Sequence, residues 1–156
     1  MIVLAIDPGP TESAWVLWDG SRLHGMGIDP NETALLRVGG SLADRLAVEM
    51  VASYGMAVGE EVFSTVFWAG RLVQAWGGQD WTGIYRLDVK LHLCHSARAK
   101  DSNIRQVLID RLGPPGTKAK PGVTYGVRTH LWSALAVAVT AWDKQNEPAG
   151  RAGERG

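Results

Sequence analysis

The sequence opens with a continuous apolar run that ends in one acidic residue. Residues 2–6 are all aliphatic, and Asp7 follows them directly. An uninterrupted run of this kind is typical of a strand that is buried on both faces of a sheet. The following Pro8-Gly9 indicates a tight turn. We therefore expect a central strand that delivers a carboxylate to its carboxyl end, where open α/β sheets place ligands. The alternative is that Asp7 only initiates the turn.

The rest of the chain alternates between strand patterns and helix patterns. Asp19-Gly20 follows the second strand pattern and predicts a two-residue hairpin of type I′, in which both turn residues have a positive φ. The order of the segments predicts an α/β fold, in which helices flank a central mixed sheet of five strands. We predict strands at residues 2–7, 13–18, 21–28, 45–51 and 82–94, and helices at residues 31–36, 58–76, 100–112 and 127–142.

Length and composition fit one folded domain. The chain has 156 residues, of which 46% are hydrophobic, so we expect residues 1–145 to form one domain with a proper hydrophobic core. The Pro/Gly/Arg-rich residues 146–156 are predicted to form a disordered tail. Cys94 is the one cysteine, which excludes a disulfide within the chain. The first residues lack a basic leader, and no apolar run reaches the roughly 20 residues that span a bilayer. We therefore expect a cytoplasmic protein without membrane contacts.

The formal net charge is zero, but the charges are unevenly distributed. Residues 1–85 hold four basic and ten acidic side chains, whereas residues 86–128 hold nine basic and three acidic ones. A basic segment in a neutral chain predicts a surface that faces phosphates. A solvated helix face followed by a basic loop is the alternative interpretation.

Three further residues stand out as candidates for chemistry. Glu49 interrupts the apolar strand 45–51, where a charge is costly unless it is paired or bound to a metal. His130 falls near the start of the last predicted helix and could ligate a metal or relay a proton. Asp101 opens the helix 100–112. The alternatives are an edge strand for Glu49, a half-buried structural role for His130 and simple N-capping for Asp101.

His92, Cys94 and His95 resemble a zinc site in residue type alone. If residues 82–94 form a strand, His92 and Cys94 face one side and His95 the other. The second pair of ligands that a structural zinc site needs is missing. We therefore predict no metal site here.

Several segments, taken in order, resemble the RuvC-type Holliday junction resolvases of the ribonuclease H-like superfamily. Ile6-Asp7-Pro8-Gly9 resembles their first catalytic strand, residues 46–51 resemble the second, and residues 129–138 resemble the final helix. The similarity covers residues 2–143. Phage-type members are also similar at Tyr54-Gly55-Met56, at residues 100–106 and at residues 125–127.

The resemblance implies a ribonuclease H-like fold and a structure-selective endonuclease that cuts four-way DNA junctions by metal-dependent hydrolysis. It implies two Mg²⁺ or Mn²⁺ ions per site, held by Asp7, Glu49, His130 and Asp101, in a bacterial or phage-infected cell. Two such ions activate water and stabilise both reacting oxygens. Ser133 departs from the family, which has an acidic ligand at the matching position. Serine is a poor ligand for a hard cation, so either the second ion is held with fewer ligands or Asp101 contributes from elsewhere.

The resemblance also implies partners. Tyr54 is expected to stack on an unpaired base, although a plain loop or core role is the alternative. Symmetric cutting of a junction implies a homodimer, for which the doubly apolar helix 58–76 is the candidate interface unless it is buried within the monomer. Rival functions are a nuclease for RNA–DNA hybrid or general branched DNA, and a non-catalytic junction-binding protein. The basic residues expected to contact phosphates are Arg98, Lys100, Arg105, Lys118, Lys120 and Arg128.

Overall fold

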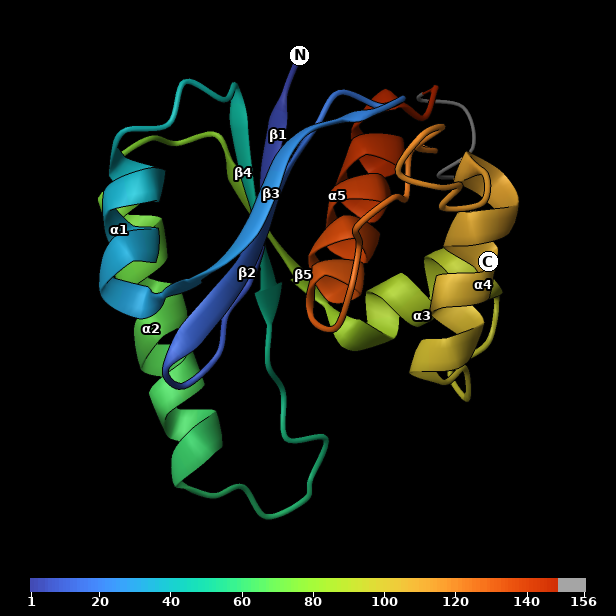
Figure 1. Cartoon of the computed structure of the whole chain (residues 1–156). Coiled ribbons are helices and arrows are strands. Elements are labelled where there is room, and N and C mark those ends of the chain that lie inside the picture. The colour runs from blue at the N-terminus through green and yellow to red at the C-terminus, as the bar shows by residue number, and fades with distance from the viewer. Residues whose placement is uncertain (149–156) are drawn as a thin grey trace.

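The computed structural model describes residues 1–148, so most of the tail that was predicted to be disordered lies outside the described residues. One mixed sheet lies between two groups of helices (Figure 1). The elements in chain order are β1 (Val3–Asp7), β2 (Glu12–Trp18), β3 (Leu23–Pro30), α1 (Asn31–Gly39), β4 (Arg45–Met50), α2 (Glu60–Trp76), β5 (Trp81–Tyr85), α3 (Arg86–Cys94), α4 (Asp101–Leu112) and α5 (Leu131–Asn146).

The sheet confirms the predicted mixed arrangement of five strands. Its order is β3-β2-β1-β4-β5, with β1 in the centre. The first three strands form an antiparallel meander, whereas β1, β4 and β5 are parallel. The carboxyl ends of β1, β4 and β5 therefore meet at one edge of the sheet, where open sheets of this kind bind ligands.

Each face of the sheet has its own hydrophobic core. Helices α1 and α2 cover one face, and α5 covers the other with α3 and α4 outside it (Figure 1). On the α5 side, Ala134 and Ala138 are completely buried, and these small side chains let the helix lie close to β1 and β2. Because side chains alternate along a strand, the face that β1 turns to α5 includes Val3 and Ala5 and continues to Asp7.

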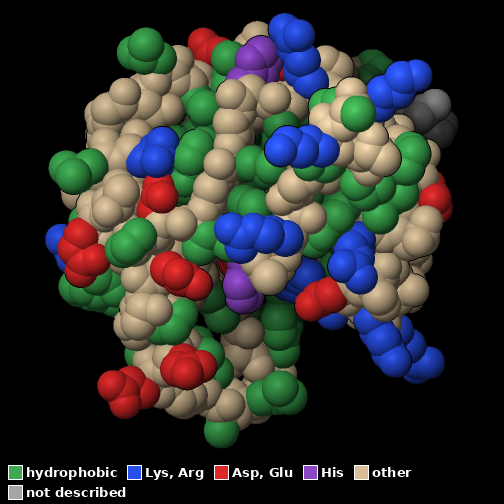
Figure 2. Space-filling view, in the orientation of Figure 1, with side chains coloured by type: hydrophobic (Ala, Val, Ile, Leu, Met, Phe, Trp, Pro, Cys, Tyr) green, Lys and Arg blue, Asp and Glu red, His purple; other side chains and the backbone are tan. Residues whose placement is uncertain are grey.

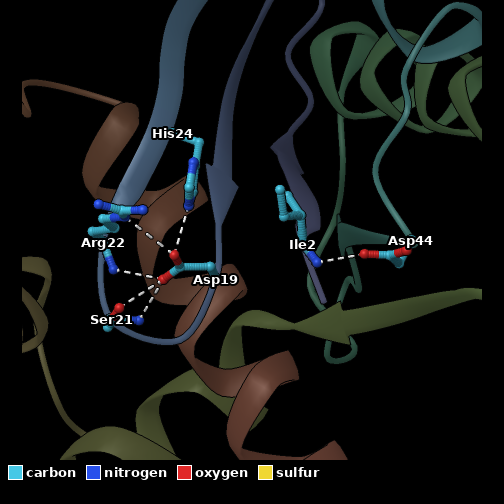
Figure 3. A network of polar contacts seen from close by, with 6 residues as sticks. All are labelled: Ile2, Asp19, Ser21, Arg22, His24 and Asp44. Carbon is cyan, nitrogen blue, oxygen red and sulfur yellow. Dashed lines mark hydrogen bonds and ion pairs between the residues drawn. The ribbon is translucent and has the colours of Figure 1, made fainter.

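The hairpin between β2 and β3 forms, but its turn differs from the predicted one. Gly20 has φ 94°, whereas Asp19 does not have a positive φ, so the type I′ turn was wrong. Instead, the Asp19 carboxylate accepts hydrogen bonds from the backbone N–H groups of Ser21 and Arg22 and closes a longer loop (Figure 3). His24 also contacts this carboxylate at 2.6 Å. An Asx-type turn satisfies the loop without a second left-handed residue.

The predicted fifth strand is too long, because residues 86–94 form the helix α3. The alternation of apolar residues in this segment suggested a strand, but the buried ones, Val89 and Leu93, are four residues apart, as on a helix. Leu91, which fits only the strand pattern, is exposed. The helix starts where the backbone N–H of Tyr85 donates to the Asp88 carboxylate at 3.1 Å. This local cap competes with continuation of the strand.

The last helix begins later than predicted. Thr129 has φ 45°, in the left-handed region, and α5 starts at Leu131 rather than near residue 127. His130 is therefore the residue that immediately precedes the helix. Within residues 1–148, no helix has the length and apolar character needed to cross a membrane.

Candidate active site

Asp7 and Glu49 lie side by side at the carboxyl ends of neighbouring strands. Asp7 is the last residue of β1, and Glu49 is the penultimate residue of β4. The two strands are parallel, and Ile6 pairs with Val48, the residues directly before the two acids. Both side chains are mostly buried, at 14% and 13% exposure, which excludes the edge-strand interpretation of Glu49. Backbone pairing of the central strands therefore fixes two carboxylates together.

Burial of this pair disfavours its ionised form. Burial raises the pKa of Glu49 to about 8, and the nearby charge of Asp7 adds to the rise. Burial also raises the pKa of Asp7 to about 6, although a hydrogen bond with Glu49 and the charge of Arg86 offset part of the effect. Burial is the main cause in both acids, whereas the interaction between the two raises the pKa of Glu49 and lowers that of Asp7. Such perturbed acids in an open site are typical of functional centres.

His130, the residue directly before α5, contacts the carboxylate of Asp7. Its Nδ1 lies 3.0 Å from Asp7 Oδ2, while 73% of its side chain remains exposed. The Ser133 hydroxyl, one turn further along, also lowers the pKa of Asp7. A cavity of about 330 Å³ opens beside them, and Gly9 and Thr65 form part of its wall. The site thus combines a buried acid pair with a solvent-accessible imidazole.

Arg86 is a functional candidate that the sequence interpretation missed. It is the first residue of α3 and directly follows β5, so it enters the site at the same edge of the sheet. Its Nη1 lies 3.8 Å from Glu49 Oε1, and its Nη2 donates a short hydrogen bond to Asp101 Oδ1. The guanidinium therefore lies between Glu49 and Asp101. A basic residue at the end of a predicted strand would have been the only signal, and the overlong strand prediction hid it.

The acid pair fits a divalent cation. Glu49 Oε2 is buried and has no hydrogen-bond partner among the described residues, so it is free to ligate. Mg²⁺ is commonly bound by one or two carboxylates and completed by water and substrate phosphate. Within residues 1–148, however, no three His, Cys, Asp or Glu side chains converge on a common point as a closed metal cage. The structure brings Asp7, Glu49 and His130 together but holds Asp101 through Arg86.

Asn31 braces the turn that carries Asp7. Its side chain is fully buried, and its Nδ2 donates to the carbonyl of Gly9 at 2.9 Å. Its Oδ1 accepts a hydrogen bond of 2.6 Å from the Ser13 hydroxyl. A Cβ at position 9 would lie 2.4 Å from the carbonyl oxygen of Glu12, so only glycine fits there. The hydrogen bond from Asn31 and the close packing of Gly9 against Glu12 therefore fix the Asp-Pro-Gly turn.

The basic residues predicted to contact phosphate are exposed. Figure 2 shows Lys and Arg side chains over the half of the molecule that contains α4 and the loop before α5, and acidic side chains over the opposite half. Lys100 immediately precedes Asp101, and Arg105 lines a shallow groove with Asp101 and Trp132. Arg128 lies two residues before His130. The exposed set comprises Arg98, Lys100, Arg105, Lys118, Lys120 and Arg128.

The loop before α5 has an internal brace. An antiparallel bridge joins Gly116 to Pro121, and the backbone N–H of Thr117 donates to the carbonyl of Lys120. At its base, the buried Thr124 hydroxyl donates to the carbonyl of Gly113 at 3.0 Å. Lys118 and Lys120 are therefore presented from a defined turn.

Tyr54 and the outer face of α2 are also exposed. Tyr54 has φ 49° and lies in the turn between β4 and α2. Phe63 and Phe67 are 65% and 61% exposed, so they are not buried within the monomer. The guanidinium of Arg71 stacks over the rings of Phe67 and Trp68.

His92 pairs with an acidic residue of α5. Its Nε2 lies 2.8 Å from Asp143 Oδ2, and Arg111 binds the same carboxylate. The side chain of His92 faces α5, whereas His95 ends α3 in a left-handed conformation. The strand alternation that was used to argue against a metal site here was wrong, because residues 86–94 are helical.

Comparison with known proteins identifies the fold. No protein-family model matches the sequence, and a search of curated protein sequences found no significant match. Among solved structures, RuvC of Thermus thermophilus is similar, with a TM-score of 0.68, 23% identity, and coverage of 93% of this chain and 96% of that chain. T. thermophilus RuvC in complex with Holliday junction substrate gives a TM-score of 0.68 at 22% identity, covering 90% and 92%. The chain therefore has the ribonuclease H-like fold of RuvC.

Proposed function

We propose that this protein is a metal-dependent endonuclease that resolves four-way DNA junctions. The observation that carries the proposal is the buried Asp7–Glu49 pair at the carboxyl ends of two parallel central strands. A fold shared with a RuvC that has been captured on a Holliday junction substrate supports the choice of DNA. The basic surface around α4 supports a nucleic-acid substrate in general.

The residues of the site divide the chemistry between them. Asp7 and Glu49 would hold a divalent cation, which when bound lowers the pKa of water and neutralises charge on the phosphate. His130 reaches Asp7 with one ring nitrogen, and its exposed ring is placed to orient or deprotonate the attacking water. Arg86 offsets the negative charge that approaches with the DNA phosphate.

The DNA-binding surface extends from the site onto α4 and the braced loop. Lys100 and Arg105 flank Asp101, and Lys118 and Lys120 extend the basic surface. These contacts would position the backbone without reading sequence. Tyr54 is exposed on the turn after β4, the strand of Glu49, where its ring could stack on an unpaired base at the junction centre.

A homodimer would match the symmetry of the junction. The exposed apolar strip of α2, formed by Phe63, Val66 and Phe67, is the candidate interface. An isologous contact through this helix would place two copies of the active site on one junction.

Incubation with a labelled synthetic four-way junction tests the proposal. We expect paired, symmetric nicks with Mg²⁺ or Mn²⁺, none with EDTA, and none in Asp7→Asn or Glu49→Gln. Asp110→Asn, an exposed acid on α4, is the matched control and should cut normally. Tight binding without cutting in any metal would instead identify a junction-binding protein. Cutting of RNA–DNA hybrid but not of junctions would replace the proposed substrate.

A further inference from the structure

The position of Arg86 bears on how many cations the active site holds. Its guanidinium contacts Glu49 Oε1 on one side and Asp101 Oδ1 on the other. Nη1 is buried and has no hydrogen-bond partner among the described residues, so its charge is directed at the acid cluster rather than at solvent. The inference drawn from this placement rests on the metal-dependent function proposed above.

Arg86 contacts one oxygen of each of two carboxylates, Glu49 Oε1 and Asp101 Oδ1. Glu49 turns Oε1 to Arg86, whereas Oε2 is unpartnered. Asp101 is exposed and opens α4, and its contact with Arg86 is the one that ties it to the site. A cation between Glu49 and Asp101 would therefore need the space and the oxygens that the guanidinium already occupies.

The net charge of the cluster also favours a single divalent cation. The ionised carboxylates of Asp7, Glu49 and Asp101 carry three negative charges. One guanidinium and one divalent ion carry three positive charges, so the cluster with one ion would be neutral. A second divalent ion beside Arg86 would leave two uncompensated positive charges at short range. Because the side chains of Asp7 and Glu49 are mostly buried, such repulsion beside them is only weakly screened by water. Ser133, at the position where a further acid would lie, adds no negative charge.

We propose that Arg86 supplies the second positive charge of this site, so that the chain binds a single divalent cation, held by Asp7 and Glu49. The guanidinium acts on the scissile region through Glu49 and Asp101 and is a positioning residue in this sense. It replaces the second of the two ions that the sequence resemblance implies, and Asp101 serves as the partner of Arg86 rather than as a metal ligand.

Counting bound Mn²⁺ on the DNA-free protein tests this directly. Isothermal titration calorimetry, with free Mn²⁺ followed in parallel by electron paramagnetic resonance, gives the number of ions per chain independently of cleavage. We expect one ion per chain in the wild type and in Arg86→Lys, which keeps the charge. Arg86→Met frees Asp101 and Glu49 Oε1 and should bind two ions per chain.

A matched variant separates this effect from the simple loss of an ion pair. Arg111→Met breaks the contacts with Asp143 at 2.6 and 2.7 Å, remote from the acids, and should still bind one ion. Melting in EDTA, compared with melting in Mn²⁺, adds a second readout. Mn²⁺ should restore the stability lost in Arg86→Met but not that lost in Arg111→Met.

The outcomes distinguish the two proposals. One ion in the wild type and two in Arg86→Met supports the role of Arg86. Two ions in the wild type, or one ion in both proteins, overturns it and leaves the nuclease proposal in place. Absence of Mn²⁺ binding in both proteins, up to millimolar concentration, would overturn the metal-dependent function itself.

Discussion

His130 Nδ1 lies 3.0 Å from Asp7 Oδ2, although 123 positions separate the two residues in the chain. The contact joins the central strand of the sheet to the residue before α5. His130 is otherwise exposed, so this contact does little for the fold. Its position on a buried, functional acid is the reason to test it by kinetics rather than by stability.

His130→Ala should impair cleavage without impairing folding. Removing an exposed side chain should change the free energy of unfolding by less than about 0.5 kcal/mol. Loss of a group that orients or deprotonates water should lower the single-turnover cleavage rate by roughly 10²-fold or more, with junction affinity unchanged. His24→Ala, a histidine paired with Asp19 in the β2–β3 hairpin, is the control. An unchanged rate would assign His130 to scaffolding.

Glu49→Gln should stabilise the metal-free protein. Burial and the charge of Asp7 raise the pKa of Glu49 from 4.5 to about 8, so its ionised form is unfavourable in the fold. The contribution of Glu49 to stability is therefore fully present below pH 4.5 and is lost as the pH rises towards 8, whereas the glutamine does not titrate. In EDTA, the variant should exceed the wild type by about 1–2 kcal/mol at pH 8 and by much less at pH 5.

Urea denaturation at both pH values in EDTA measures this difference. Asp110→Asn, whose acid is exposed on α4, should show no comparable gain at pH 8. A variant less stable than the wild type at pH 8 would show instead that the ion pair of Glu49 with Arg86 outweighs the cost of its burial.

Asn31→Ala should destabilise the fold and the site together. The change leaves the Gly9 carbonyl and the buried Ser13 hydroxyl without their partners. Unsatisfied buried groups of this kind cost about 1–3 kcal/mol each. Thermal melting should show the loss, and cleavage should fall in protein that is still folded, because the turn after Asp7 is no longer braced. Asn103→Ala, which removes an exposed capping contact to Lys100, should cost only about 1 kcal/mol and retain activity.

Phe67→Asp should convert a dimer into a monomer. Phe67 is an exposed aromatic residue of the apolar strip of α2, and an aspartate there would be desolvated without a partner in an isologous interface. Light scattering coupled to gel filtration should give twice the chain mass of 16.8 kDa for the wild type and 16.8 kDa for the variant. Leu42→Asp changes an even more exposed apolar residue outside the strip and should leave the mass unchanged. A monomeric wild type would contradict the proposed assembly.

The sequence was informative where a pattern depends on local chemistry. The apolar run that ends at Asp7, and the charge inside the strand of Glu49, predicted both strands and both buried acids, because few other structures tolerate those patterns. The segment after Tyr85 was misread because its apolar residues alternate by chance while its helix cap is local. Arg86 could not be found, because its contacts exist only once β5 pairs with β4 and α3 starts at its end.

The close docking of α5 on the sheet makes core volume a determinant of the distance between Asp7 and His130. Asp7 belongs to the sheet and His130 to the start of the helix, and fully buried alanines such as Ala138 set the spacing between the two. Two added methyl groups at such a position, as in Ala138→Val, would be absorbed as a small outward shift of α5. A shift of a few tenths of an ångström is tolerable for packing but not for an aligned imidazole. Substitutions hidden in this layer should therefore be detected first as slow turnover in protein that still melts cooperatively.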